Sequence, residues 1–167
     1  MSVILNASNN GTLGVHPRTV VLRCRNAEAS NAIAKYDLVR LDFSQTSIEP
    51  GQGDAAVTAA SNSKFANVVL GPTGRSNTTT GIYGVAQEAI PAGSTGNIMF
   101  AGVTPVTCAS ATYAANQLVG IPASGLTAGR VTNASVAQNV ATVLVGGTTV
   151  TQITVLLEGG ISIGAQV

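Results

Sequence analysis

The sequence predicts an all-β protein, a small β-barrel or sandwich with an extended N-terminal arm. Short runs of alternating apolar and polar residues recur along the chain, and Thr, Val and Ile are abundant within them. Gly- and Pro-containing turn signals separate these runs. Only residues 26–35 approach helical spacing, and a short turn fits them equally well. A length of 167 residues suits a single β domain, which we place at 19–167.

The N-terminal segment, residues 1–18, is polar and weakly patterned, and its Pro17 cannot donate to a sheet ladder. We therefore expect an extended arm that binds a neighbouring protein. An apolar patch in it could add a strand to a neighbour's edge, and two cationic groups could meet an acidic surface. The candidate binding residues are Val3, Ile4, Leu5, His16 and Arg18. The alternative is that the arm caps the open edge of its own domain.

Six alternating segments predict strands with one buried face. They are residues 19–25, 38–43, 82–87, 97–104, 117–121 and 149–157. In the first segment, Val20, Leu22 and Cys24 share one face. In the second, LVRLDF, the same alternation predicts one buried and one exposed face. In the last, one face carries Thr151, Ile153, Val155 and Leu157.

Charge is scarce and unevenly distributed. The chain has eight Lys+Arg, seven Asp+Glu and 9% charged residues, against about 25% in an ordinary soluble domain. Residues 89–167 contain only Arg130 and Glu158. A surface with so little charge is poorly protected against association, so we expect it to be buried in an assembly. The absence of a basic stripe argues against a nucleic-acid partner.

The sequence offers no arrangement of residues typical of catalysis. The segment GPTGRS at 71–76 resembles a phosphate-binding loop, but its glycines are too close and Arg75 replaces the lysine, so a turn is favoured. His16 is the only histidine and has no nearby nucleophile. The carboxylates lack the spacing of a calcium loop. We expect no catalytic residue, no metal and no cofactor, and hence no enzyme.

Cys24 and Cys108 lie far apart in a chain that is long enough to fold without a cross-link. Buried free thiols are the favoured interpretation, and a disulfide is the alternative. No apolar run is long enough to span a membrane, and the N-terminus lacks the pattern of a signal peptide. The expectation is a protein made in a reducing cytoplasm, with no membrane partner.

A short sequence repeat is also present. Residues 85–87 and 136–138 both read VAQ, and each triplet precedes a predicted strand. The repeat hints at a duplicated β-hairpin, although a shared triplet also arises readily by chance.

The stretch GVAQEAIPAGSTGNIMFAG, residues 84–102, resembles a β-module of tailed-bacteriophage virion proteins. The shared pattern is a G-V-A strand, an acidic residue, a turn with A-G, and a G-x-I strand ending in Gly. Upstream, AKYDLVRL at 34–41 is similar to the module's A-K-G-D-x-V-x-L, with Tyr36 in place of the Gly. Downstream, YAANQL at 113–118 and GLT at 125–127 resemble the following segment, with Asn116-Gln117 in place of Gly-Asp.

The resemblance implies a bacteriophage head decoration (cement) protein with no catalytic activity. Such a protein would bind the major capsid protein on the outer head surface and bridge its neighbours as a homotrimer. It would be made in the host bacterial cytoplasm and reside in the virion. The charge-poor residues 89–167 would supply the trimer seam. The alternative is a tail-fibre or spike-associated adhesion module, in which exposed loops such as 71–80 bind host surface glycan.

Overall fold

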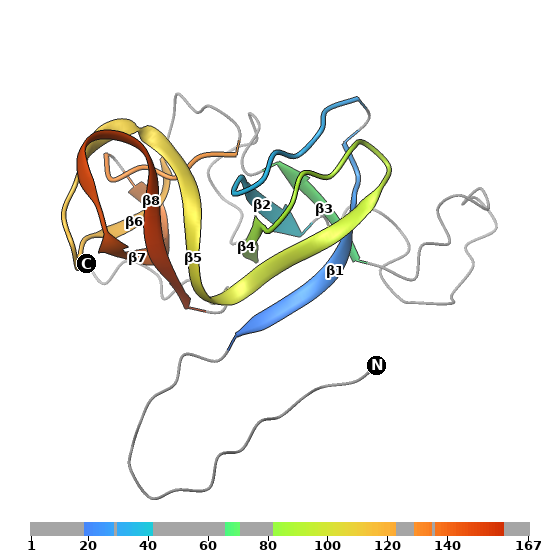
Figure 1. Ribbon diagram of the computed structural model, residues 1–167, viewed down its shortest axis with the longest axis horizontal. Helices are drawn as coiled ribbons and strands as arrows, with labels where there is room; N and C mark the ends of the chain where they lie inside the picture. Colours follow the sequence, from blue (N-terminus) through green and yellow to red (C-terminus); the bar gives the residue numbers. More distant parts are fainter. Residues whose placement is uncertain are drawn as a thin grey trace, which may run out of the picture.

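A computed structural model describes residues 19–28, 30–41, 66–70, 82–122, 129–134 and 136–158 (Figure 1). Strands make up 70% of this part of the chain, and it contains no helix. The prediction of an all-β fold is confirmed. The described residues of segment 26–35 finish a strand and then form an isolated bridge and turns, so the helical spacing there does not produce a helix.

Eight strands form one sheet, in the order β1-β3-β2-β4-β5-β8-β7-β6 with an additional β1–β5 pairing. The strands are β1 (Val20–Asn26), β2 (Leu38–Leu41), β3 (Ala66–Leu70), β4 (Tyr83–Ala86), β5 (Thr95–Tyr113), β6 (Leu118–Pro122), β7 (Val136–Val145) and β8 (Gly147–Glu158). All pairs are antiparallel except β1–β3. The six predicted segments correspond to β1, β2, β4, β5, β6 and β8, whereas β3 and β7 were not among them.

The long strand β5 belongs to two closed circuits of strand pairing. Strands β1, β3, β2, β4 and the first part of β5 form one circuit, which we call the first unit. The rest of β5 with β8, β7, β6 and residues 131–132 forms the second unit. Figure 1 shows β5 bending between the two units. Ala101 pairs with strands of both units, and the next residue, Gly102, has a φ of 121°. Residues other than glycine rarely adopt this backbone conformation.

The two units repeat the same register. Each contains a row of four directly paired residues that crosses four strands. In the first unit the row is Val21, Met99, Val85 and Leu38. In the second unit the row is Val103, Leu156, Thr142 and Leu118. The second part of β5 therefore corresponds to β1, and β6, β7 and β8 correspond to β2, β4 and β5.

The turns that precede β2 and β6 are also equivalent. Tyr36 and Asn116 adopt left-handed conformations, with φ of 72° and 66°. In each turn the next side chain accepts a hydrogen bond from the backbone N–H three residues earlier, at 2.9 Å for Asp37 and 3.1 Å for Gln117. The left-handed region favours glycine, and it is at these two positions that the bacteriophage module has Gly.

The two units are thus structurally similar, but the two VAQ triplets do not lie at corresponding positions. In the observed register Val85 corresponds to Thr142, because each is paired with the first residue of β2 or β6. Val136 instead pairs with Pro122 at the far end of β6. Matching the two VAQ triplets is therefore the wrong register, and the turns before β2 and β6 carry the real correspondence.

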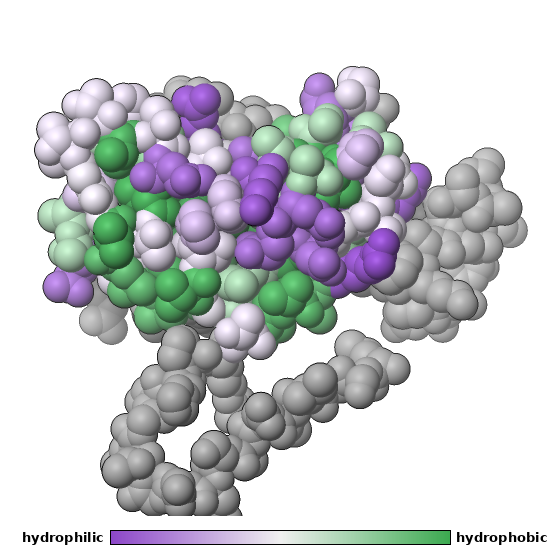
Figure 2. Space-filling model, in the orientation of Figure 1, coloured by the Kyte–Doolittle hydropathy of each residue, from purple (hydrophilic) through white to green (hydrophobic). Residues whose placement is uncertain are grey.

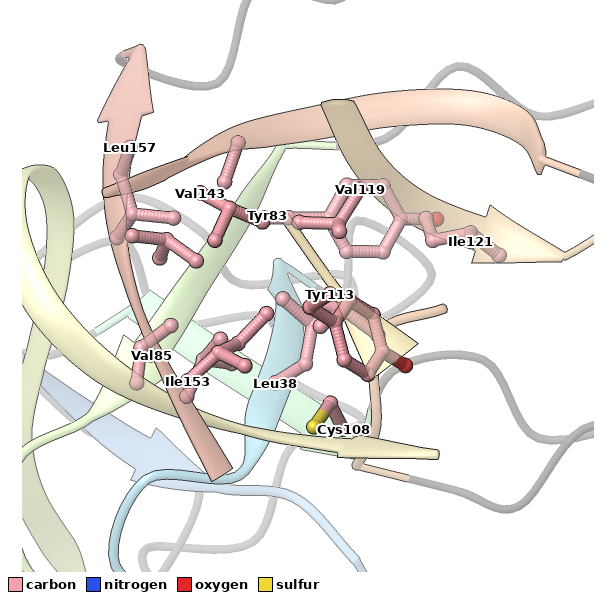
Figure 3. Close-up of a cluster of buried hydrophobic side chains, with 14 residues drawn as sticks. Leu38, Tyr83, Val85, Cys108, Tyr113, Val119, Ile121, Val143, Ile153 and Leu157 are labelled. Atoms are coloured by element: carbon pink, nitrogen blue, oxygen red, sulfur yellow. The ribbon is translucent and has the colours of Figure 1, made fainter. Parts of the chain in front are cut away.

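Each unit has its own buried cluster. The cluster of the first unit contains Cys24, Ile33, Val39, Val68, Ala86, Ile90, Ile98 and Phe100. The cluster of the second unit also includes Leu38, Tyr83 and Val85 from the first unit (Figure 3). The expectation of one exposed face at 38–43 is therefore wrong where β2 begins, because the second unit covers Leu38 while Val39 faces the first core.

Alternation holds over most of β8 and fails in β1. Ile153, Val155 and Leu157 are buried on one face of β8, as predicted, but Thr151, expected on the same face, is exposed. In β1, Cys24 is buried but Leu22, expected on the same face, is exposed. The start of β1 extends past the core of the first unit, so both of its faces remain open.

Candidate functional site

The most distinctive surface of the described residues is an apolar outer face on the second unit. Val103, Leu156, Thr142 and Leu118 lie side by side across β5, β8, β7 and β6. Leu144 and Val145 continue this surface at the end of β7. We call these six residues the outer face. Its exposed members, Val103, Leu118, Leu144 and Val145, are 39% to 63% exposed, whereas large apolar side chains are usually buried.

The described side chains of the outer face carry no charge. Of the charged side chains that the structure describes, the first unit carries Arg23, Arg25, Glu28, Lys35, Asp37, Arg40 and Glu88, and the second unit carries Arg130; Glu158 is the last residue of β8. Glu88 accepts a hydrogen bond from the backbone N–H of Asn97 at 2.8 Å, so this charge is tied to the β4–β5 connection. In Figure 2 hydrophobic residues gather along the lower edge, over the second unit and β1, whereas hydrophilic residues cross the middle of the molecule.

The corresponding face of the first unit is covered. Leu38 and Val85 are fully buried, and Met99 packs against the cluster of the second unit. Figure 3 shows Leu38 and Val85 among Ile153 and the other side chains of that cluster. Val21, the fourth residue of the row, remains 44% exposed. Leu38, Val85 and Met99 therefore form an internal interface in the first unit, whereas Val103 and Leu118 of the corresponding row are exposed in the second.

A second exposed apolar segment lies at the start of β1. Val20, Val21 and Leu22 are 40% to 44% exposed, and we call these three residues the β1 edge. Consecutive apolar residues with both faces open to water are unusual in a strand, since one face normally packs on a core. The outer face and the β1 edge together contain every exposed large apolar residue of the described chain except Ile82.

The two thiols are free and buried, one in each cluster, which confirms the favoured prediction for Cys24 and Cys108. Burial raises the pKa of Cys24 to about 11 and also raises the pKa of Cys108. Both thiols are therefore protonated at neutral pH and are poor nucleophiles. Burial, followed by the neighbouring Cys108, raises the pKa of Tyr113 to about 12, and its hydroxyl donates to the Ala109 carbonyl at 2.8 Å.

Within the described ranges, no group of three His, Cys, Asp or Glu side chains could hold a metal ion. The same residues include no helix long and apolar enough to cross a membrane. The proposed arm residues Val3, Ile4, Leu5, His16 and Arg18 lie outside the described residues, as does loop 71–80.

The sequence predicted an interface only as the broad range 89–167 and did not single out the residues of the outer face. A usable signal was present, because AKYDLV at 34–39 and AANQLV at 114–119 align without a gap. That alignment pairs Leu38 with Leu118 and would have directed attention to the exposed counterpart of a core position.

The fold and the site together define an all-β chain with two related units and an uncharged apolar surface suited to assembly. Searches against protein-family models, curated proteins and solved structures give no match for this chain.

Proposed function

We propose that this chain is a structural protein of a tailed-bacteriophage virion. It is a capsid decoration (cement) protein that binds the outer head surface as a homotrimer and bridges neighbouring major capsid proteins. The observation that carries the proposal is the backbone conformation at Tyr36 and Asn116, whose φ values are 72° and 66°. The bacteriophage module has glycine at both positions, and glycine is the residue that a left-handed backbone favours.

The outer face supports a role in assembly. A bridging protein needs a rigid surface that excludes water at each contact, and an apolar sheet face with paired backbone groups meets that need. The low charge of the second unit suits burial between subunits better than long exposure to solvent. Neither described thiol is activated for chemistry, so the described residues offer a surface for contact more than a site for reaction.

Capsid binding in this proposal involves the arm, residues 1–18, as the element that engages the shell. Three arms on one trimer would act together, with an effective concentration on the order of millimolar for the second and third contacts. Individual exposed charge pairs made by His16 or Arg18 would add at most about 1 kcal/mol each, so apolar contacts and multiplicity dominate.

The location in the virion is tested by measuring copy number per particle on a quantitative gel. A head protein is expected in hundreds of copies, whereas a tail-fibre adhesion module would be present in a few to tens of copies. The second result would replace the proposed function with the adhesion alternative.

The role of the arm is tested by deleting residues 2–15 and adding the protein to undecorated heads. We expect the variant to fold and melt cooperatively but to leave the heads undecorated. Full-length protein mixed with the same heads is the positive control. Unchanged decoration by the deletion variant, or loss of its folding, contradicts a binding role for the arm.

A further inference from the structure

We infer that copies of this chain associate head to tail, with the outer face of one copy covering the β1 edge of the next. The inference deepens the proposed function, in which the chain is a homotrimer, by naming the two surfaces that meet. It rests on the repeated register of the two units, and this register is independent of any capsid.

The interface between the two units is the starting point. In the first unit, the row that contains Leu38, Val85 and Met99 faces the cluster of the second unit. The Gln87 side chain extends this contact, since its amide nitrogen donates to the Thr104 hydroxyl at 3.1 Å. The first unit thus presents one particular face to the unit that follows it.

The second unit carries the same face, and the described residues leave part of it exposed. Leu118 is the counterpart of Leu38, and it is 50% exposed where Leu38 is 0% exposed. Leu144 follows Val143 as Gln87 follows Ala86, and these two preceding residues pair equivalently with β8 and β5. The surface that would contact a third unit is therefore present, apolar and uncovered.

The second unit's side of this internal interface also has a counterpart in the first unit. Thr104 is opposite Val155 in the second unit, as Leu22 is opposite Ile98 in the first unit. Thr104 is 1% exposed, and the Gln87 side chain hydrogen bonds to it, whereas Leu22 is 41% exposed. The β1 edge is thus the uncovered counterpart of a position that the internal interface buries.

The residue types at these contact positions differ between the internal interface and the two exposed surfaces. Inside the chain the equivalent positions hold the polar pair Gln87 and Thr104, which hydrogen bond to each other. At the two free surfaces the same positions hold Leu144 and Leu22. An apolar residue on each side is the combination that a dry contact between copies requires, and it makes the two surfaces complementary.

A contact between two different surfaces is heterologous, so it closes into a ring or continues as a filament. Covering both surfaces in every copy requires closure, and a ring of three copies is the homotrimer of the proposed function. The start of β1 would then lie against the outer face of the preceding copy, which accounts for its exposure on both faces in a single chain.

The test uses two full-length variants, Leu144→Lys on the outer face and Leu22→Glu on the β1 edge. Both side chains are partly exposed, so each variant should keep the far-UV circular dichroism of the wild type. We expect the wild type to associate at micromolar concentration. Each variant alone should run at the mass of one chain, 16.7 kDa, in light scattering.

Mixing the two variants gives the decisive measurement. The Leu22→Glu copy retains an intact outer face and the Leu144→Lys copy retains an intact β1 edge, so native mass spectrometry should show complexes that contain both. Ile82→Lys is the matched control, because Ile82 is exposed and apolar but belongs to neither surface. This variant should associate as the wild type does.

A wild type that stays a single chain at micromolar concentration overturns the inference. So does association that survives Leu22→Glu but not Leu144→Lys, because this pattern means that two outer faces meet each other. Copy number and head decoration are separate readouts. Association without any place in the head contradicts only the proposed function. Decoration by single chains contradicts the head-to-tail contact and the homotrimer, and leaves the proposed place in the head standing.

Discussion

The two units share one register but differ in what covers them. The row through Leu38 and Val85 is buried in the first unit, and the row through Leu118 and Thr142 is the outer face of the second. Nothing in the local pattern of either strand separates the two cases. Leu38 and Val85 are buried because the second unit packs against them, so burial at these positions depends on a neighbouring unit more than on the strand's own sequence.

The shared strand explains why the first unit is covered so completely. Because β5 runs without a break from one unit into the other, the second unit is held against β2 and β4 by its own backbone. The association of the two units then costs none of the translational freedom that a second chain would lose. No described strand holds a further unit against the outer face in this way.

The largest expected effect comes from truncating the two corresponding leucines. Leu38→Ala removes a fully buried side chain, and we expect the free energy of unfolding to fall by about 2–5 kcal/mol. Leu118→Ala removes a half-exposed one and should change the stability of the isolated chain by at most about 0.5 kcal/mol. Urea denaturation at several protein concentrations separates folding from association.

Equal losses of stability in these two variants would mean that the outer face is packed within a single chain. A small loss in Leu38→Ala would instead mean that the two units do not share a core.

A second comparison concerns the residues Gly84 and Ala141, which occupy corresponding positions in β4 and β7. A Cβ at Gly84 would lie 2.6 Å from Ile98 Cγ2 and 2.8 Å from the Met99 carbonyl oxygen, both closer than contact distance. Gly84→Ala should therefore destabilise the protein by about 1–3 kcal/mol.

The control is the reverse change at the corresponding position. Ala141→Gly should cost about 1 kcal/mol through backbone entropy, without any clash. Thermal melts of the two variants measure the difference. A Gly84→Ala variant as stable as the wild type would show that the first unit is more loosely packed at β4 than this distance implies.

Much of the fold was predictable from the sequence because alternation reports local burial. The strand at 149–157 was placed correctly, since one of its faces packs on a core and the other does not. The pattern failed at Leu38 and Leu22, where burial depends on a distant unit or on its absence. The break in charge after Glu88 predicts an interface within residues 89–167, and this stays a prediction. The outer face could be defined only from the register of β5 to β8.

The smallest expected effect concerns the turn residues Asp37 and Gln117. Burial raises the pKa of Asp37, and this effect outweighs the opposing hydrogen bonds from the Ala34 N–H and Thr107 and the charge of Arg130. Gln117 holds the same position in the second unit with a neutral amide, and its oxygen accepts the same type of backbone hydrogen bond. The second turn therefore avoids the cost of burying a charge.

Asp37→Asn should make the first turn behave like the second. An acid whose folded pKa is raised stabilises the protein below its unfolded pKa, near 3.8, and that contribution is lost as pH rises through the folded pKa. The variant lacks this titration, so its stability relative to the wild type should increase from pH 3.5 to pH 7. The gain at pH 7 should stay below about 1 kcal/mol, because water screens the half-exposed carboxyl. Urea denaturation at the two pH values measures it. A relative stability that falls toward pH 7 would mean that the charged Asp37 carboxylate, held by Ala34 and Arg130, favours the fold.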